Sequence, residues 1–383
     1  MRKKRLIQRC VKLLCLLLSV LLLSSLCTTM CLIYDNNKTT LAGFYAEPKN
    51  SLDVVLLGAS EVFSGFSSAY AYEQYGFTSY PLGLDATTST LYESELKEIL
   101  KRQKPQWIVV EINGLLYDDP AMHTDEGALR RYLDNIPLSV NKVETILEKV
   151  PREEWLHYLF PLSKYHSNWK GMPDQLGRIK SIWTFYLRGH SLLRGNVTNG
   201  IITPSPEMRA IAGNYSTAPL EPQSEQHLRA LLQFCRDNEL DNVLFVRFPH
   251  AVCSDWSYGR FQRCNEAERI IRENGFDFIN MERDYEEIGL DFSTDFYNED
   301  HLNAYGQKKL TAYFGSILAE RYVTEPGALT RHQKESWDAS AEYIRLFYEY
   351  YDERTKQGIQ DTYWETCDLI SELDSRKARQ DNS

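Results

Sequence analysis

A serine and a histidine occupy positions where an α/β sheet could use them for chemistry. Ser60 ends the segment DVVLLGAS (residues 53–60), directly after an apolar run. His301 lies far along the chain in DFYNEDHLNAYG (residues 295–306), where a loop gives way to a helical pattern. A hydroxyl activated by an imidazole is the nucleophile of serine esterases and acyltransferases. Because doubly wound sheets carry their sites at the carboxyl ends of the strands, the pair predicts acyl-ester chemistry. The alternative is that Ser60 only caps a helix or fills a turn.

Three side chains are candidates for orienting the imidazole of His301. Asn298 lies three residues before it, and its amide oxygen could accept the ring N–H without supplying charge to stabilise imidazolium. Asp300 is adjacent in sequence, but neighbouring side chains diverge on a helix or strand. Asp295 could reach the ring only through a turn. We rank them Asn298, Asp300 and then Asp295, and a backbone carbonyl stays open as a fourth possibility.

A parallel sheet is needed to bring these residues together, and the pattern of hydrophobicity predicts one. Continuous apolar runs at residues 54–57, 107–112, 243–248 and 276–279 are typical of buried strands. Amphipathic helical stripes lie between them and after residue 301. Apolar strands alternating with helices indicate an α/β fold, a three-layer α/β/α domain with helices on both faces of a parallel sheet.

The N-terminal segment predicts a membrane anchor. Six bases precede the first acidic residue, and an almost uncharged apolar run follows. We expect residues 1–12 to be a basic cytoplasmic segment and residues 13–34 a transmembrane signal anchor, with the main domain extracytoplasmic. A cleaved signal peptide is the alternative, although no clean small-x-small cleavage site stands out. The polar residues 35–50 are expected to form a stalk.

The remaining chain divides into a catalytic domain and a tail. Residues 51–325 form the expected α/β domain, interrupted at about 116–223 by an aromatic-rich and proline-rich helical insertion. We expect this insertion to pack over the catalytic edge of the sheet and to shape the substrate site. Residues 326–383 are expected to be helical, with two apolar stripes that make core contacts: Trp337, Ala341, Ile344, Phe347 and Tyr351, then Ile359, Tyr363, Cys367 and Ile370.

Charge and cysteine usage exclude several classes of function. Six of the 43 basic residues lie before residue 13, which leaves 37. Residues 13–383 also contain all 53 acidic residues, so this part of the chain has a net charge of about −16. Nucleic acid is a poor partner for such a surface. The cysteine spacing fits no zinc site, and no metal or organic cofactor is expected. Cys253 and Cys264 could form a disulfide or stay as thiols. Arg247 and His250 are expected in a surface ion pair and a solvated loop, or else at an anion site.

The spacing of the serine and the histidine resembles the SGNH (GDSL-like) hydrolase superfamily, whose fold is flavodoxin-like. In that family Ser follows the first strand and a late Asp-x-x-His supplies acid and base. Here Gly58-Ala59-Ser60 replaces Gly-Asp-Ser, and Asn298 occupies the position of the acid. The anchor and the run HLNAYG (residues 301–306) resemble the branch with DltD-type and cell-wall O-acetylation proteins. The resemblance covers about residues 51–325.

The resemblance implies an oxyanion hole and a class of substrate. The family uses a Gly after the second strand and an Asn after the third, positions that Gly83 and Asn113 match. It implies transfer or removal of an O-acetyl or D-alanyl ester on an envelope polysaccharide or teichoic-acid-like polymer, with a membrane-bound acyltransferase as partner. Because Asn298 replaces the acid, a degenerate domain that binds glycopolymer or scaffolds an envelope acylation complex is the alternative. Phosphoryl transfer is disfavoured, since neither a phosphate loop nor paired metal carboxylates are found.

Overall fold

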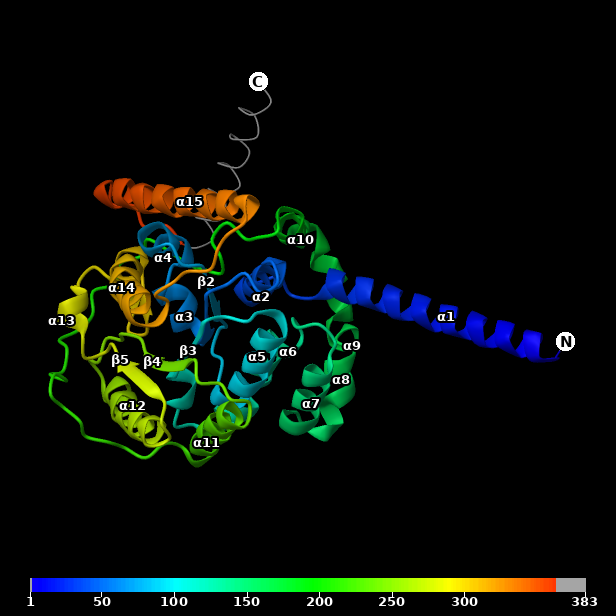
Figure 1. Ribbon diagram of the computed structural model, residues 1–383, viewed down its shortest axis with the longest axis horizontal. Coiled ribbons are helices and arrows are strands. Elements are labelled where there is room, and N and C mark those ends of the chain that lie inside the picture. The colour runs from blue at the N-terminus through cyan, green and yellow to red at the C-terminus, as the bar shows by residue number, and fades with distance from the viewer. Residues whose placement is uncertain (1, 363–383) are drawn as a thin grey trace, which may run out of the picture.

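Five parallel strands form the central sheet of the computed structural model, which describes residues 2–362 (Figure 1). The order is β2-β1-β3-β4-β5, so the chain reverses direction of winding between β1 and β3. Gly58 pairs with Gly83 on one side of β1, and Leu57 pairs with Val110 on the other. Ligands bind at such a switch point in open α/β sheets. The strands are β1 (Val54–Gly58), β2 (Ser79–Gly83), β3 (Trp107–Glu111), β4 (Val243–Arg247) and β5 (Asp277–Asn280).

Helices cover both faces of the sheet, as the alternating pattern predicted. One face packs on α5 (Ser89–Arg102), α11 (Pro222–Asp237) and α12 (Asp255–Glu273), through a core that includes Val55, Leu57 and Phe245. The other face packs on α4 (Ser68–Tyr75) and α14 (Ala304–Ile317), through a core that includes Val54 and Leu56. Alternate residues of β1 therefore enter opposite cores. The predicted α/β class and the parallel sheet are confirmed.

Strand β2 was not visible as an apolar run. Its sequence SYPLG contains a proline, which removes a ladder donor and is tolerated at a sheet edge. β2 is an edge strand. Its burial comes instead from helices α2 (Asn36–Ala46) and α3 (Ser60–Gly65), which contact it.

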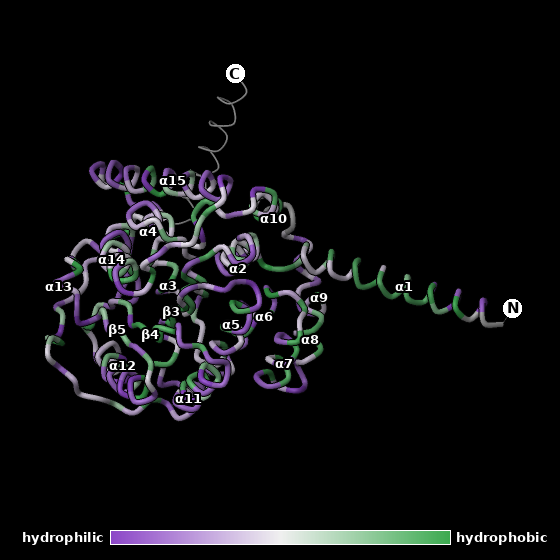
Figure 2. The backbone as a smooth tube through the Cα atoms, in the orientation of Figure 1, coloured by the Kyte–Doolittle hydropathy of each residue, from purple (hydrophilic) through white to green (hydrophobic). Residues whose placement is uncertain are grey.

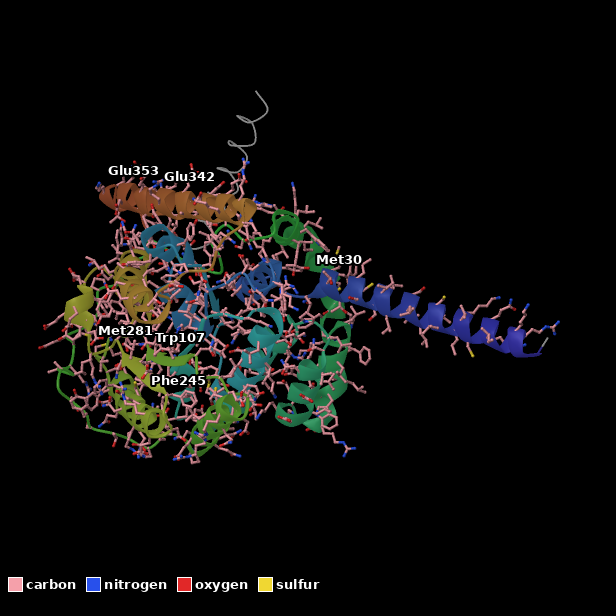
Figure 3. All side chains as sticks on the ribbon, viewed as in Figure 1. Met30, Trp107, Phe245, Met281, Glu342 and Glu353 are labelled. Carbon is pink, nitrogen blue, oxygen red and sulfur yellow. The ribbon has the colours of Figure 1, made fainter. Side chains whose placement is uncertain are left out.

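The N-terminal helix α1 (Arg2–Cys31) projects away from the domain (Figure 1). Its stretch Ile7–Cys31 is long and apolar enough to cross a membrane. Figure 2 shows this apolar character along the helix, and Figure 3 shows its side chains standing free of the domain until about Met30. This length and composition fit a single-pass anchor.

Residues 35–50 do not form the expected stalk. They contain helix α2, which starts at an Asp35 cap and buries residues including Leu41 and Phe44 against the main core. The polar composition was misleading, because several of these polar groups are bonded within the domain. Asn37, for example, is almost fully buried and bonds Asp85.

The insertion divides into a helical part and an extended part. Helices of its first part enlarge the layer of α5 or lie beside α1 and α2, away from the expected place over the catalytic edge. The extended residues 189–221 do reach that edge, where the Val197 amide donates to Phe63 O and Asn303 donates to Ile201 O. The short helix η1 (Asn113–Leu115) precedes the insertion. The helices of the insertion are η2 (Pro120–Thr124), α6 (Glu126–Leu133), α7 (Val140–Lys149), η3 (Arg152–Glu154), α8 (Trp155–Leu159), α9 (Leu162–Tyr165), η4 (His166–Gly171) and α10 (Met172–Arg188).

The tail packs on the domain through its first stripe, as predicted. Helix α15 (Arg331–Lys356) lies on α4, and all five residues of that stripe are buried. Of the second stripe, only Ile359 lies within the described residues. The remaining elements are α13 (Tyr285–Ile288), η5 (Leu318–Tyr322) and the two-stranded hairpin of β6 (Phe296–Asn298) and β7 (His301–Leu302).

Candidate functional site

Ser60 begins helix α3 immediately beyond the carboxyl end of β1. The chain turns at Gly58, whose φ of +152° is rarely adopted by residues with a side chain. A Cβ at Gly58 would also lie 3.0 Å from the Glu111 carbonyl oxygen. Gly58 therefore allows the chain to turn directly from the end of β1 into α3. Ser60 itself is half-buried, so the turn holds the residue without closing it off from solvent.

His301 reaches Ser60 from the β6–β7 hairpin rather than from a helix start. Its Nε2 lies 2.6 Å from Ser60 Oγ. Helix α14 begins three residues later, where the Asn303 side chain accepts the backbone N–H groups of Tyr305 and Gly306. The structure therefore brings together the two residues that the sequence singled out.

Asn298 holds the imidazole in one tautomer. Its Oδ1 accepts the backbone N–H groups of Asp300 and His301, each at 2.9 Å, which identifies this atom as the oxygen. The same oxygen lies 2.8 Å from His301 Nδ1. Since an amide oxygen can only accept, Nδ1 carries the proton and Nε2 presents its lone pair to Ser60. The Ser60 hydroxyl thus donates to a ring nitrogen that is ready to take its proton.

The two aspartates that were weighed as orienters have other partners. Asp300 pairs with Arg260. Asp295 is buried, accepts the backbone N–H of Asp291 and pairs with Lys309 at 2.7 Å. Asp295 therefore fixes the loop before the hairpin, while Asn298 alone of the three bonds the ring of His301.

Burial sets the protonation of His301. Desolvation lowers the pKa of the imidazole below its usual 6.5, although the carboxylates of Glu61 and Asp300 act in the opposite direction. A lowered pKa keeps the ring neutral near pH 7. A neutral imidazole is the form that can act as a general base.

Gly83 lies against the start of α3. A Cβ at this position would be 2.6 Å from Ala59 O and 3.0 Å from Phe63 N, so only glycine permits this approach. Leu84 donates its N–H to Gly58 O, which ties the end of β2 to the end of β1. Gly83 thus borders the Ser60 turn, and its oxyanion role stays a prediction.

Asn113 is fully buried and its side chain is already engaged. Its Nδ2 donates to Glu61 Oε1, and its Oδ1 accepts from Arg247 at 2.7 Å and from Arg260 at 3.3 Å. The second Nδ2 proton has only a long contact of 3.5 Å to Tyr117 Oη. Asn113 therefore links charged groups behind Ser60, and its predicted role as an oxyanion donor has no further support from this geometry.

A buried ionic network lies behind the serine, and most of its residues were not predicted from the sequence. Arg247 is fully buried between Glu111 at 3.5 Å and Glu282 at 2.9 Å. His250 is also buried, between Glu61 and Glu282. The expected surface ion pair and solvated loop are therefore wrong for Arg247 and His250. The reason is that β4 is a central strand, so its carboxyl end is covered by its neighbours.

The network favours the protonated form of His250. Nδ1 of His250 lies 2.7 Å from the carbonyl oxygen of Phe248 and must donate, and Nε2 faces the carboxylate of Glu61 at 3.5 Å. Burial and Arg247 lower the pKa of His250, but its bonds to Glu282 and Glu61 outweigh them and raise it. In turn, burial raises the pKa of Glu61, but His250 and His301 outweigh this and lower it to about 2. The Ser60–His301 pair therefore stands beside an ionised carboxylate.

A sequence signal for these residues exists in hindsight. Glu61 directly follows Ser60, Glu111 ends an apolar strand, and Glu282 follows another. A charged residue at the carboxyl end of an apolar parallel strand lies at the same edge of the sheet as the carboxyl ends of the other strands. Glu111 carries this signal directly, whereas Glu61 lies in α3 and Glu282 lies two residues beyond the end of β5.

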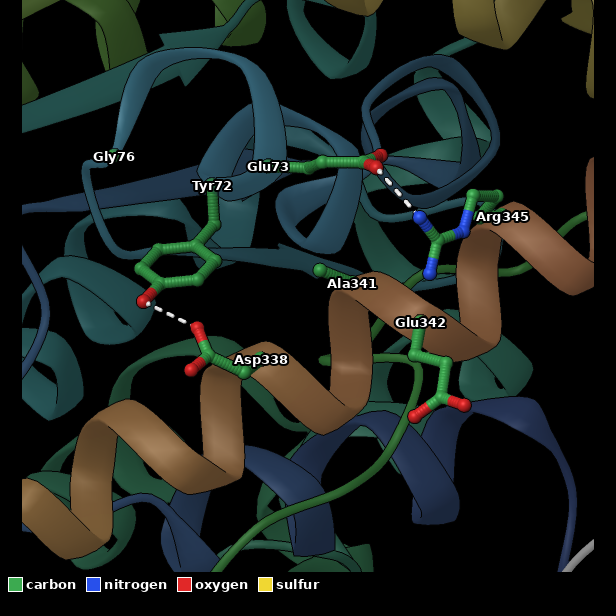
Figure 4. Close-up of a pocket in the computed structure, with 7 residues that line it drawn as sticks. All are labelled: Tyr72, Glu73, Gly76, Asp338, Ala341, Glu342 and Arg345. Carbon is green, nitrogen blue, oxygen red and sulfur yellow. Dashed lines mark hydrogen bonds and ion pairs between the residues drawn. The ribbon is translucent and has the colours of Figure 1, made fainter.

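Other candidate sites are weaker. Within residues 2–362, no cluster of three or more His, Cys, Asp or Glu side chains has the geometry to hold a metal. Cys253 and Cys264 are free thiols. A hollow of about 350 Å³ lies between α4 and α15 (Figure 4), lined in part by Tyr72, Asp338 and Arg345. Tyr72 bonds Asp338 across it, and no residue of the Ser60 site lines it.

Comparison of the chain with protein-family models, with curated proteins and with solved structures gives no significant match in any of the three.

Proposed function

We propose that this chain is a membrane-anchored, extracytoplasmic serine acyl-esterase or acyltransferase of the SGNH type. The single observation that carries the proposal is the 2.6 Å hydrogen bond from Ser60 Oγ to His301 Nε2, in a tautomer fixed by Asn298. Support also comes from the strand order, which puts β1 and β3 at the switch point of the sheet.

In the proposed first step, Ser60 Oγ attacks the carbonyl carbon of an acyl ester. The hydroxyl proton moves to His301 Nε2 as the Oγ–C bond forms, and the carbonyl electron pair moves onto oxygen. The tetrahedral intermediate then collapses, the bond to the leaving alcohol breaks, and the imidazolium returns its proton to that alcohol. Backbone N–H groups at the Ser60 turn and at Gly83, with the Asn113 amide, are the proposed donors to the oxyanion.

In the second step, a sugar hydroxyl or water attacks the acyl-Ser60 ester. His301 removes its proton, and the Ser60–acyl bond breaks with return of the proton to Ser60. A hydroxyl acceptor makes the reaction a transfer, and water makes it a hydrolysis. The proposed imidazolium is balanced by the neighbouring Glu61 carboxylate, which offsets the absence of an acid at Asn298.

The proposed location follows from the apolar stretch of α1 and from the basic residues at its N-terminal end. The base of α1 is packed into the domain, since Cys31, Leu32 and Tyr34 are almost fully buried. This supports retention of the segment as an anchor over cleavage, which would open that packing. An anchored esterase would act on polymers near the membrane. The resemblance of the anchor and the HLNAYG run points to O-acetyl or D-alanyl esters of an envelope glycopolymer, with a membrane-bound acyltransferase as donor partner.

A second candidate is a domain that binds glycopolymer or scaffolds an envelope acylation complex without turnover. The observation in its favour is that Asn298 supplies no negative charge to the imidazole. Asn113, the proposed side-chain oxyanion donor, is also occupied by Glu61. Both facts reduce the expected rate without removing the nucleophile.

Covalent labelling with a fluorophosphonate separates the two functions. The full chain in detergent is expected to label at Ser60, Ser60→Ala to lose labelling, and His301→Ala to label at least 100-fold more slowly. Ser163→Ala is the matched control, because Ser163 Oγ also bonds a histidine, His157, at 2.8 Å but on the exposed surface. Equal labelling of all variants, or none of the native chain, would contradict catalysis. Turnover of p-nitrophenyl acetate gives the same comparison for hydrolysis.

A further inference from the structure

We propose that helix α10 and the segment before it lie on the surface of the lipid bilayer that α1 enters, bound to anionic phospholipid headgroups. The surface concerned, called the apolar collar, is formed by Phe160, Trp169, Leu176, Trp183 and Leu187. These side chains are 52%, 60%, 51%, 59% and 87% exposed. The inference goes beyond the proposed esterase function. It depends only on the part of that proposal in which α1 is a membrane anchor.

The collar surrounds the end of the membrane-spanning stretch. Asn168, next to Trp169, donates to the carbonyl of Cys31 at 3.1 Å, and Cys31 ends that stretch. Met30 and Tyr34 pack with Ile179 and Ile182 of α10. Figure 1 shows α9 and α10 on either side of the base of α1, with α10 running across α1 rather than along it. A bilayer crossed by α1 would therefore meet these elements first.

Helix α10 has two apolar faces, and the domain uses only one. Ile179, Ile182 and Phe185 face α2 and the end of α1. Leu176, Trp183 and Leu187, at spacings of seven and four, share a second face that is exposed. A helix with an apolar face left in water at a membrane boundary matches an interfacial helix, with Trp at the headgroup level.

The charge of this segment is opposite to that of the rest of the protein. Residues 162–188 contain five bases and one acid, whereas the whole chain has a formal charge of −10. Lys170 and Lys180 are exposed beside the collar tryptophans. Basic residues near a bilayer attract anionic lipids. A protein partner for the collar would not require this reversal of sign, so we assign the collar to lipid.

Binding of the collar would set the height of the candidate site. Asn37, in the first turn of α2, bonds Asp85 through both its amide atoms, at 2.9 Å and 2.7 Å. Asp85 follows Gly83 by two residues. The end of β2 is therefore tied to the chain just after the anchor, and a domain bound through the collar holds Ser60 at a fixed height above the membrane surface.

Tryptophan quenching by brominated lipids tests the inference on the full chain in vesicles. None of the seven tryptophans lies in α1, so any quenching reports contact of the domain with lipid. In vesicles with phosphatidylglycerol, we expect a quenched component that the double variant W169F/W183F reduces at least twofold. W256F is the matched control, because Trp256 is 45% exposed on α12, away from α1.

Two further measurements make the result decisive. The double variant Lys170→Glu/Lys180→Glu is expected to reduce quenching in phosphatidylglycerol vesicles at least twofold. Flotation with the vesicles reports attachment of the whole chain to the bilayer, and fluorophosphonate labelling of Ser60 reports the proposed enzyme separately. A chain that floats without quenching, or whose quenching survives W169F/W183F, overturns the collar proposal and points to a protein partner instead. A chain that does not float overturns the anchor, and the collar proposal with it.

Discussion

Asn298 Oδ1 lies 2.8 Å from Nδ1 of His301 and also accepts the backbone N–H of the same residue at 2.9 Å. The side chain and the backbone of His301 are thus bound to one atom. This double contact fixes the ring plane and the tautomer without a negative charge. In triads with an aspartate, replacement by asparagine fails because the wrong tautomer results. Here the backbone donors prevent that outcome, since they keep the amide oxygen toward the ring.

Asn298→Ala should therefore lower the rate of Ser60 labelling by up to roughly 100-fold, because it frees the ring of His301, and a correctly positioned base contributes about that much. Asn298→Asp keeps the acceptor and adds a negative charge beside the ring, so it should raise the pKa of His301. The measurement is the pH dependence of labelling for both variants. Equal rates for the alanine variant and the native chain would show that Asn298 does not position the ring.

The native pH profile should be determined by His301. Its pKa is lowered by burial, so the ring is neutral at pH 7 and becomes protonated only below 6.5. Protonation removes the lone pair that accepts the Ser60 proton. The rate should therefore be highest at neutral pH and above, and should fall as the pH falls through a midpoint below 6.5. A midpoint above 7 in the labelling rate would contradict this environment for His301.

Glu61→Gln should destabilise the fold. The change leaves Asn113 and His250 without their carboxylate, and breaking a buried charged pair costs about 3–5 kcal/mol. The pKa of Glu61 is about 2 in the folded chain, against 4.5 for the free group. Its stabilisation is therefore present above pH 4.5 and is lost as the pH falls from 4.5 toward 2.

Thermal melts of the native chain and of Glu61→Gln should consequently differ at pH 7 and converge toward pH 2. Glu266→Gln is the control, since Glu266 bonds Arg269 on the exposed side of α12 and should cost about 0–1 kcal/mol. A constant difference in melting temperature across this range would show that Glu61 is not ionised in the fold.

Gly58→Ala should disturb the Ser60 turn. The alanine would have to adopt a φ of +152° and would meet Val62 at 2.9 Å and Glu111 at 3.0 Å. We expect a loss of about 1–3 kcal/mol and a fall in Ser60 labelling. Gly177→Ala, in α10, meets nothing within 4 Å and should be neutral or stabilise by up to about 1 kcal/mol. Melting temperature and labelling rate of both variants give the comparison.

Arg194→Ala should loosen the C-terminal helix from the domain. Arg194 is buried, bonds both oxygens of Glu47 at 2.7 Å, and lies 4.0 Å over the ring of Trp337. Its removal leaves Glu47 as an unpaired buried charge, at a cost of about 3–5 kcal/mol. Arg345, which only approaches Glu73 at 4.0 Å on the surface (Figure 4), is the control and should cost about 0–1 kcal/mol on change to Ala. Similar melting temperatures for the two variants would contradict the buried pairing.

Local patterns of hydrophobicity predicted most of the parallel strands and the C-terminal helix, but they did not predict β2 or α2. Apolar runs predicted β1, β3, β4 and β5 because buried parallel strands are apolar on both faces. The same rule could not find β2, an edge strand with a proline, or α2, whose polar residues are buried by partners from elsewhere in the chain. The five-residue stripe of α15 was predicted correctly, since its burial repeats with the helical period.

The sequence by itself determined the parallel α/β class, the apolar N-terminal helix, and the choice of Ser60 and His301 as the candidate pair, because each depends on neighbouring residues or on the end of a strand. Only the tertiary structure decided that Asn298, and neither Asp300 nor Asp295, bonds His301. It also decided that Arg247 and His250 are buried with three glutamates. Pairing between side chains far apart in the chain depends on how strands and loops converge in space, and no local periodicity records that convergence.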